Sequence, residues 1–214
     1  MKLKPLSRRK LLFLTAAIPV LGAANRLSFA DELVRRTVTP RQTEGPFYPR
    51  RKPSDVDNDL AVFGNSEDLA VGDLLTLKGR VIDRQGNAIS GARVELWHCD
   101  HLGQYHHVDA EGPSDTNFQG YGELTTNEAG SYNFRTVKPG KYPGRARHIH
   151  FKVIAAGRSP LTSQMYFDDE TDSNMRDGIY KRLSVKERTA VTIEIRSGAQ
   201  GENTLEGLLD IVLA

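Results

Sequence analysis

The sequence predicts an all-β protein, an antiparallel β-sandwich with an irregular N-terminal arm and long loops. Three observations carry this prediction. Between residues 74 and 200, apolar and polar residues alternate over short runs, which is the pattern of half-buried strands. Turn sequences rich in glycine, asparagine and proline separate the runs, as in sandwiches of short strands. No run in this part of the chain has the long 3.6-residue period of an amphipathic helix.

Residues 1–30 are expected to be an export signal that is removed from the mature chain. A basic start without acidic residues is followed by the apolar run Leu11 to Ala24 and by the small-residue exit Ser28-Phe29-Ala30. The pair Arg8-Arg9 also resembles a twin-arginine signal, which would suit export after folding around a cofactor. The alternative is a membrane anchor, but the apolar run is short for a bilayer and contains Pro19. We therefore expect a periplasmic or extracellular protein without stable membrane insertion.

Composition and charge exclude some classes of function for the mature chain. Charged residues at 26% and hydrophobic residues at 38% are ordinary for a globular domain. Six of the 29 lysines and arginines lie in residues 1–30, which hold no acidic residue, so the remainder has 23 basic and 27 acidic residues, a formal charge of −4. No basic surface is left that would suggest nucleic acid as a partner. Cys99 is the single cysteine, so no internal disulfide can form.

The mature chain divides into an arm and a domain. Residues 31–73 are rich in proline, aspartate and asparagine and have little periodicity, so we expect an arm packed on a domain that spans residues 74–214. Five runs predict strands in the domain, through Leu75, Leu77 and Val81; Val94, Leu96 and His98; Tyr132 and Phe134; Phe151 and Val153; and Val191, Ile193 and Ile195. Predicted turns lie at residues 83–87, 127–130 and 138–140. Residues 168–186 are expected to be a polar loop, which can include a helical turn.

The stretch Lys141–Val153, KYPGRARHIHFKV, contains the first candidate for chemistry. His148 and His150 alternate along the predicted strand, so both side chains project from one face while Ile149 faces the core. Such a pair can chelate a metal, although an exposed pair on a strand would have the same pattern. No aspartate or glutamate lies within ten residues of His148, so the carboxylate partner of a ferrous site is missing here and Tyr142 is the nearby oxygen donor.

A tyrosine ligand restricts the choice of metal. A free phenol has a pKa of about 10, so a hard and highly charged ion is needed to hold phenolate at neutral pH, and ferric iron fits. Two phenolates, a hydroxide and two neutral imidazoles would balance its charge and complete its coordination. A zinc or copper site at His98, Cys99 and His101 is the alternative, but neighbours on a strand face opposite ways and a zinc site normally has more than one thiolate.

Three separate motifs resemble the intradiol ring-cleavage dioxygenases, especially their protocatechuate type and exported members. They are Thr39–Tyr48 (TPRQTEGPFY), Val94–Tyr105 (VELWHCDHLGQY), and Phe118–Pro143 followed by His148–Phe151 (HIHF). The motifs occur in the order found in the family, and the resemblance covers roughly residues 39 to 167. It implies a transthyretin-like β-sandwich and one non-haem Fe(III) per chain.

The resemblance also implies roles for individual residues. The ferric ligands of the family fall on Tyr105, Tyr142, His148 and His150. Tyr142 resembles the axial tyrosinate that substrate displaces, and the family's active-site arginine and glutamine fall on Arg145 and Gln164. The residues with which the family's arm lines the substrate pocket fall on Thr43, Gly45, Pro46 and Phe47. The segment between Tyr142 and His148 is shorter than in the protocatechuate enzymes, so the position of Arg145 depends on that shorter loop.

The expected reaction is cleavage of an aromatic ortho-diol between its two hydroxylated carbons, with both atoms of O2 entering a muconate-type diacid. Tyr142 and a hydroxide would take the two diol protons, Arg145 would stabilise anionic charge, and Gln164 would orient the substrate. The alternative is a secreted transthyretin-like binding module without catalysis, which residues 79–94 would also suit. Trp97 is expected to pack in the core. The sequence is compatible with several substituents on the diol ring and with a homo-oligomer.

Overall fold

The computed structural model describes residues 36–105, 114–198 and 204–214, which belong to one compact unit, Arg35–Ala214. The predicted export signal at residues 1–30 lies outside the described residues, and its prediction stands as made. Within the described ranges, no helix is long and apolar enough to cross a membrane.

Strands make up most of the regular structure. They are β1 (Leu74–Asp83), β2 (Arg93–Trp97), β3 (Tyr121–Thr125), β4 (Ser131–Val137), β5 (Ile149–Ile154), β6 (Leu161–Phe167), β7 (Thr192–Ser197), β8 (Thr204–Leu208) and β9 (Ile211–Leu213). The helices follow one another between β6 and β7: η1 (Asp168–Glu170), α1 (Thr171–Arg176), η2 (Tyr180–Arg182) and α2 (Val185–Thr189). We call this part, residues 168–189, the helical segment. The prediction of an all-β protein is confirmed.

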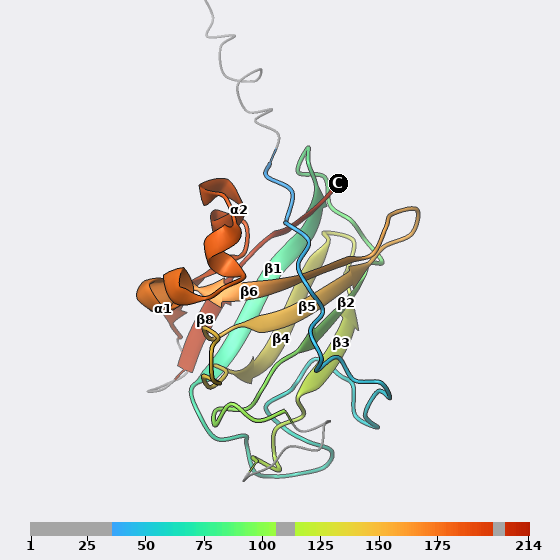
Figure 1. The fold of residues 1–214 in the computed structure, drawn as a ribbon. Helices are drawn as coiled ribbons and strands as arrows, with labels where there is room; N and C mark the ends of the chain where they lie inside the picture. The colour runs from blue at the N-terminus through green and yellow to red at the C-terminus, as the bar shows by residue number, and fades with distance from the viewer. Residues whose placement is uncertain (1–35, 106–113, 199–203) are drawn as a thin grey trace, which may run out of the picture. The chain divides into compact units, whose positions relative to one another are not determined.

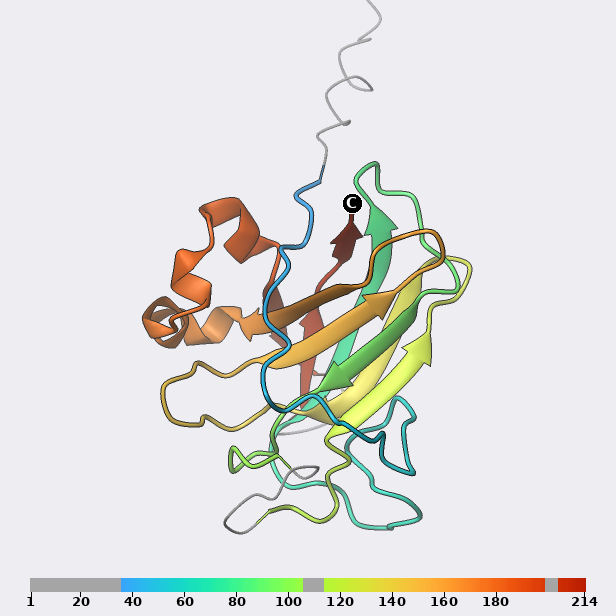
Figure 2. The ribbon, with the colours of Figure 1, turned by 45° about the vertical axis from the view of Figure 1, so that its right-hand side comes forward.

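The strands follow one hydrogen-bonded path in the order β3-β2-β5-β6-β7-β8-β1-β4, with β9 also paired to β1. The sheet curves strongly, so its β2–β3 end and its β1–β4 end lie on opposite sides of the core (Figure 1, Figure 2). The pairing is mixed, and the prediction of a wholly antiparallel sheet is wrong: β1–β8, β1–β9 and β6–β7 are parallel. Parallel neighbours need a long crossover connection, and the helical segment is the crossover from β6 to β7.

The helical segment also corrects the prediction of a polar loop at residues 168–186. Helix α2 begins with a capping box, in which the side chains of Ser184 and Glu187 each accept the other residue's backbone N–H. Asn174 in α1 donates to the Phe167 carbonyl at 2.7 Å and ties this helix to the end of β6. Because α1 has six residues and α2 has five, neither is long enough to show a helical period in the sequence.

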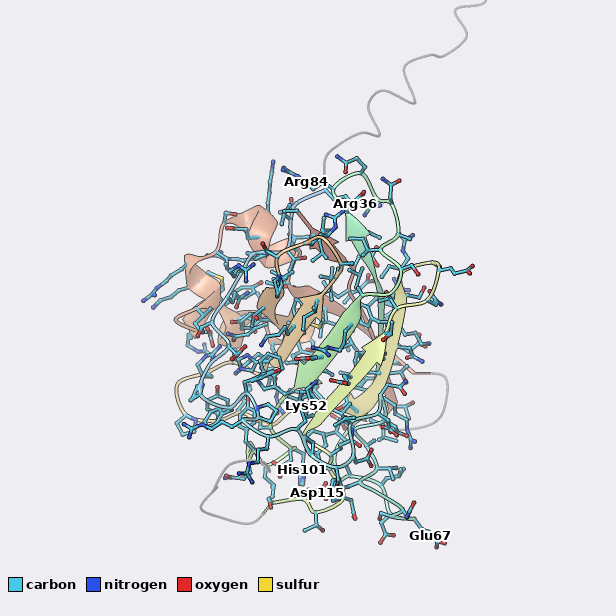
Figure 3. All side chains as sticks on the ribbon, turned by 90° about the vertical axis from the view of Figure 1, so that its right-hand side faces the viewer. Arg36, Lys52, Glu67, Arg84, His101 and Asp115 are labelled. Atoms are coloured by element: carbon cyan, nitrogen blue, oxygen red, sulfur yellow. The ribbon has the colours of Figure 1, made fainter. Side chains whose placement is uncertain are left out.

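Residues 36–73 form an arm that has no regular helix or strand apart from one isolated bridge at Asp59. The arm starts with Arg36, whose N–H donates to the Arg84 carbonyl at one end of the unit. It passes Lys52 on the way to the end that holds His101 and Asp115 (Figure 3).

The arm covers the outer face of β6. Gln42 N–H donates to the Thr162 carbonyl at 2.9 Å, and Ser163 Oγ donates to the Pro40 carbonyl at 2.6 Å. Every residue of β6 is buried as a result. The arm is therefore positioned by specific hydrogen bonds, and this matters because it carries several of the candidate site residues.

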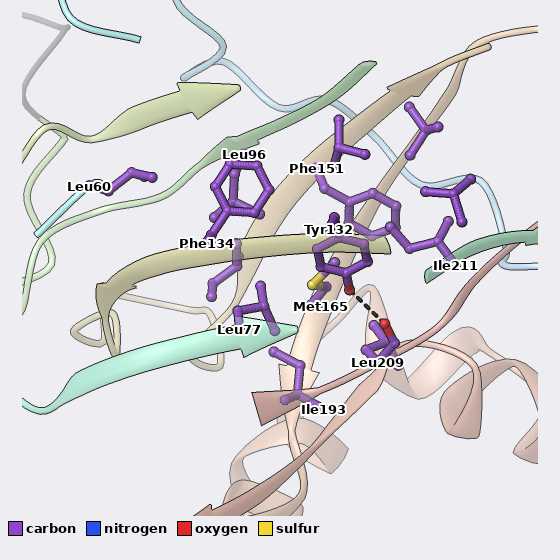
Figure 4. Close-up of a cluster of buried hydrophobic side chains, with 14 of the residues drawn as sticks. Leu60, Leu77, Leu96, Tyr132, Phe134, Phe151, Met165, Ile193, Leu209 and Ile211 are labelled. Carbon is purple, nitrogen blue, oxygen red and sulfur yellow. Dashed lines mark hydrogen bonds between the residues drawn. The ribbon is translucent and has the colours of Figure 1, made fainter. Parts of the chain in front are cut away.

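The core lies inside the curved sheet (Figure 4). Leu77 from β1, Phe134 from β4 and Phe151 from β5 are fully buried in one cluster. Tyr132 completes the cluster, and its hydroxyl donates to the Leu209 carbonyl at 2.6 Å. Side chains from both ends of the sheet thus remove apolar surface from water together, which is the main favourable contribution to folding. The opposite face of β5 carries the polar side chains His150 and Lys152.

Candidate metal centre and active site

The histidine pair lies at the start of β5. His148 directly precedes the strand and His150 is its second residue, and their rings are 4.9 Å apart between centroids. Ile149 and Phe151 point into the core, so alternation along the strand turns both imidazoles to the other face, as the sequence predicted. Both histidines are almost fully buried, at 2% and 1% exposure, which argues against a solvated surface pair.

Two tyrosines join the pair from two loops. The Tyr142 hydroxyl lies 3.3 Å from His148 Nε2, and the two rings are 5.5 Å apart. Tyr105 follows β2 through a loop, and its ring packs edge-on against Tyr142 at 6.1 Å. The structure therefore brings Tyr105, Tyr142, His148 and His150 together at one place, although they are spread over 46 positions of the sequence.

The loop before Tyr105 is shaped by Asp100, a fully buried residue. Asp100 Oδ1 accepts the N–H groups of Leu102 and Gln104, both at 2.9 Å, and Oδ2 accepts the N–H of Asp115 at 3.0 Å. A buried carboxylate that accepts several backbone N–H groups fixes a tight turn. The local sequence thus folds so that Tyr105 is directed inward.

Protonation states suit metal binding. His148 Nδ1 lies 2.7 Å from the Ala146 carbonyl, which can only accept, so the ring proton is on Nδ1 and the Nε2 lone pair faces Tyr142. Burial lowers the pKa of His148 to about 4 and holds that of His150 well below its usual value, so both rings are neutral at pH 7. Burial also raises the pKa of Tyr105 and Tyr142, so each phenol needs a cation beside it to become a phenolate.

This donor set fits a hard, highly charged metal ion. Phenolate oxygens and neutral imidazole nitrogens are its natural ligands. The buried Nδ1 of His150 has no hydrogen-bond partner among the described residues, which is a cost that a structural histidine would avoid. In the same part of the chain, no three His, Cys, Asp or Glu side chains gather as a metal cluster, so the two tyrosines are essential to the set.

The alternative site at His98, Cys99 and His101 does not form. His98 Nε2 lies 2.8 Å from Thr136 Oγ1 and its Nδ1 lies 2.7 Å from the Cys99 carbonyl, so both ring nitrogens are used in the core. The Cys99 thiol points to the Gly140 carbonyl at 3.5 Å. The side chains of His98 and Cys99 are therefore part of the packed interior.

Arg145 and Gln164 lie beside the four rings. Arg145 Nη1 donates to the Tyr142 hydroxyl at 3.3 Å, and Nη2 donates to Gln164 Oε1 at 2.5 Å. Gln164 is directly opposite His150 in the pairing of β5 with β6. Its other end, Nε2, donates to the Thr43 carbonyl at 3.2 Å. The shorter loop before His148 therefore still delivers a guanidinium group to the site.

The arm closes one side of the site. The Phe47 ring stacks on Tyr105 at 4.2 Å with an interplanar angle of 19° and meets Tyr142 edge-on at 6.1 Å. Gly45 has a φ of +73°, a backbone conformation that favours glycine, and it lies next to His150, since a Cβ there would be 3.4 Å from His150 Cε1. Pro46 lies in the turn between them. All four arm residues named from the sequence, Thr43 included, thus lie at or next to the site.

Sequence reasoning missed two contributors to the site and gave a third an incomplete role. Asp177 from the helical segment pairs with Arg145 Nε at 2.7 Å. The Tyr166 hydroxyl in β6 accepts a hydrogen bond from Arg145 Nη2 at 3.4 Å. Trp97 is buried as expected, but it also stacks on the His150 ring at 5.0 Å and 10°. The fully buried pattern of β6 hides Tyr166, and no local signal links Asp177 to a residue so far away in the chain. No local signal shows that Trp97 lies opposite His150, because this follows from the pairing of β2 with β5.

The fold and the site together define an all-β protein with a candidate centre of two tyrosines and two histidines beside a buried arginine. The family model described as Dioxygenase matches residues 43–214. The protocatechuate 3,4-dioxygenase beta chain of Burkholderia cepacia is 34% identical over 137 residues, a match that covers 59% of this chain and 58% of that one. Catechol 1,2-dioxygenase 2 of Acinetobacter lwoffii is 32% identical over 187 residues, covering 74% and 66%.

A solved structure is similar over a larger share of its length. The dioxygenase domain of a dioxygenase and carbohydrate-binding protein fusion from the cellulolytic bacterium Streptomyces sp. SirexAA-E superposes with a TM-score of 0.64. It is 33% identical, and the match covers 83% of this chain and 98% of that domain. The chain belongs to the intradiol ring-cleavage dioxygenase family. It spans 58% and 66% of the length of the two relatives named above.

Proposed function

We propose that the protein is a non-haem Fe(III) intradiol dioxygenase that cleaves a catechol-type ring between its two hydroxylated carbons, using O2. The observation that carries this proposal is the gathering of two phenols and two neutral imidazoles at one buried place. Tyr105, Tyr142, His148 and His150 would hold one iron per chain. When bound, a ferric ion supplies sites for both diol oxygens and withdraws electron density from the ring, which prepares it for O2.

Tyr142 is the residue that would move a proton. Its phenolic oxygen lies within 3.3 Å of both Arg145 Nη1 and His148 Nε2, so a phenolate there is stabilised by a positive charge. As a phenolate, this oxygen can take one hydroxyl proton from the arriving diol, as a general base does. Tyr105 sits deeper, at 3% exposure, and is suited to stay in place as a permanent ligand.

Arg145 would stabilise negative charge that develops on the ring. Its guanidinium is partly buried and already held by several partners, so it needs little reorganisation when the charge appears. Gln164 bridges Arg145 and the Thr43 carbonyl, which fixes its amide and lets it orient the ring. Phe47 stacked on Tyr105 forms an apolar wall that limits water at the site.

Iron content and oxygen uptake test the proposal directly. We expect one iron per chain, a red to brown colour from tyrosinate-to-iron charge transfer, and O2 consumption with at least one diol in a panel of catechol, protocatechuate and hydroxyquinol. Formation of a muconate-type product would identify intradiol cleavage. A colourless protein that stays inactive after iron is restored would contradict the proposal and favour the metal-free binding module.

We further propose that residues 1–30 direct export and that the domain is a transthyretin-like sandwich. We also propose that the protein assembles into a homo-oligomer. The shared core of β1, β4 and β5 supports two facing layers within the curved sheet. Cell fractionation of wild type and of a variant with both Arg8 and Arg9 changed to lysine tests export. Retention of both proteins in the cytosol would contradict it. Light scattering on the purified protein gives the assembly state.

A further inference from the structure

Asp177 is a fully buried carboxylate at the end of α1, with a side-chain exposure of 0%. Its two oxygens serve two different parts of the chain. Oδ1 accepts the N–H groups of Ile179 at 2.8 Å and Tyr180 at 3.1 Å, which closes the turn between α1 and η2. Oδ2 accepts Arg145 Nε at 2.7 Å and the Ala146 N–H at 3.0 Å, both in the loop that leads to His148.

The first of these contacts fixes the direction of Arg145. A guanidinium group is planar, so holding Nε determines where the two terminal nitrogens point. With Nε on Asp177, Nη1 is directed to the Tyr142 hydroxyl at 3.3 Å and Nη2 to Gln164 Oε1 at 2.5 Å. Without Asp177, the same nitrogens could turn away from the site.

The second contact acts on His148 through one residue. The Ala146 N–H donates to Asp177, and the Ala146 carbonyl accepts His148 Nδ1 at 2.7 Å. That histidine contact sets which ring nitrogen carries the proton, as the partners of metal-binding histidines commonly do. A single carboxylate on the helical segment thus holds both the side chain of Arg145 and the backbone of Ala146.

We propose that Asp177 is a positioning residue that aims Arg145 at Tyr142 and Gln164 and fixes the backbone that orients His148. The proposal rests on the proposed function, since it gives the helical segment a part in the same reaction. The competing explanation is that Asp177 only caps its own turn through Ile179 and Tyr180.

Asp177→Asn separates the two explanations. Its remaining oxygen can still accept the Ile179 and Tyr180 N–H groups, whereas its NH2 group faces the donors of Arg145 and Ala146 and cannot accept from them. The matched control is Asp210→Asn. Asp210 also accepts a backbone N–H and a guanidinium nitrogen, both of Arg80, at 2.9 and 3.4 Å, away from the site.

We expect Asp177→Asn to keep its iron and to lower kcat on the best diol by about 10- to 100-fold, as changes in the partners of metal-site residues do. The visible charge-transfer band should shift in the same direction as in Arg145→Ala. Asp210→Asn should leave both unchanged. In the Arg145→Ala background, Asp177→Asn should cause a smaller fall in kcat, because only the contact through Ala146 to His148 is then left to lose.

Two results would overturn the inference. One is a fall in kcat by the same factor in both backgrounds, and the other is an equal loss in the Asp210→Asn control. Asp177→Ser, whose hydroxyl can still cap the turn, replaces Asp177→Asn if that variant does not fold.

An inactive wild-type protein would contradict the proposed function, but the coupling of Asp177 with Arg145 could still be tested. Thermal midpoints of the two single variants and the double variant then decide it. Non-additive shifts support the coupling of Asp177 with Arg145, and additive shifts refute it.

Discussion

Tyr48→Phe tests how the arm is fastened to the sheet. The Tyr48 hydroxyl donates to Glu95 Oε2 at 2.8 Å, and Glu95 is fully buried in β2. Burial and the neighbouring carboxylate raise the pKa of Tyr48, so the hydroxyl stays protonated and remains a donor at all ordinary pH values. The substitution removes this donor and keeps the ring, which packs edge-on against Trp97 at 4.9 Å. The measured loss is therefore the cost of taking this donor away from a buried carboxylate.

The expected loss follows from the partners that remain. A hydrogen bond to a charged group contributes about 1.5–3 kcal/mol. Lys52 at 3.3 Å and Arg93 at 3.1 Å still contact Glu95 Oε1, so a free-energy loss near the lower end, about 2 kcal/mol, is expected. For a domain of this size, such a loss lowers Tm by about 4–8 °C. Thermal unfolding followed by circular dichroism measures it.

Tyr121→Phe is the matched control. Its hydroxyl also donates to a carboxylate oxygen at 2.8 Å, but that acceptor, Glu123, is 24% exposed and can bind water instead. The control should therefore cost less, about 1 kcal/mol or below. If Tyr121→Phe lowers Tm as much as Tyr48→Phe, burial of Glu95 is not the reason for the stability of the arm, and the reasoning fails.

The same substitution has a predicted effect on catalysis. Tyr48 directly follows Phe47, whose ring stacks on Tyr105. Loosening the arm should weaken the apolar wall of the pocket and leave the proposed iron ligands in place. We therefore expect KM for the diol to rise more than kcat falls, as oxygen-uptake kinetics would show. A fall in kcat at constant KM would contradict this role of the arm.

Three further outcomes are expected. Tyr142→Phe should change the visible band and lower kcat by about 100-fold or more, as loss of a general base does, and an unchanged spectrum would contradict its assignment. Trp97 is the single tryptophan and stacks on His150, so Fe(III) added to metal-free protein should quench its fluorescence, with an endpoint of one iron per chain. Burial tends to raise the pKa of Asp177, but the Arg145 and backbone hydrogen bonds hold it below its usual range. Its stabilising contribution is therefore complete above the unfolded value of about 3.9 and is lost as pH falls through the lower folded value, so Asp177→Asn should flatten urea-measured stability below about pH 4.

Alternation in the sequence was sufficient where one face of a strand is buried and the other is used. In β5, Ile149 and Phe151 face the core, and the period of two then directs His148 and His150 to the other side. The approach of Tyr105 to this site, through its contact with Tyr142, could not be obtained from the pattern, because it depends on how a distant loop folds. The resemblance of the motifs supplied that link, and the geometry agrees with it.

Strand β6 was not predicted because its pattern carries no alternation. All seven of its residues are buried, since the core covers one face and the arm covers the other. The parallel pairings of β7, β8 and β9 were missed for a related reason. They depend on the direction in which the helical segment returns the chain to the sheet, and short helices leave little trace in the sequence.

Gln164 shows why the arm and the helical segment belong to one site. Its Oε1 accepts Arg145 Nη2, and its Nε2 donates to the Thr43 carbonyl. Reversing the amide would place its NH2 group against a guanidinium donor and its oxygen against a carbonyl, so each partner favours the observed orientation and the two together fix it. Asp177 holds Arg145 on one side and the arm holds Thr43 on the other. Displacement of either segment therefore leaves the amide with one of these two partners, and loss of the arm should weaken the hold of Gln164 on Arg145.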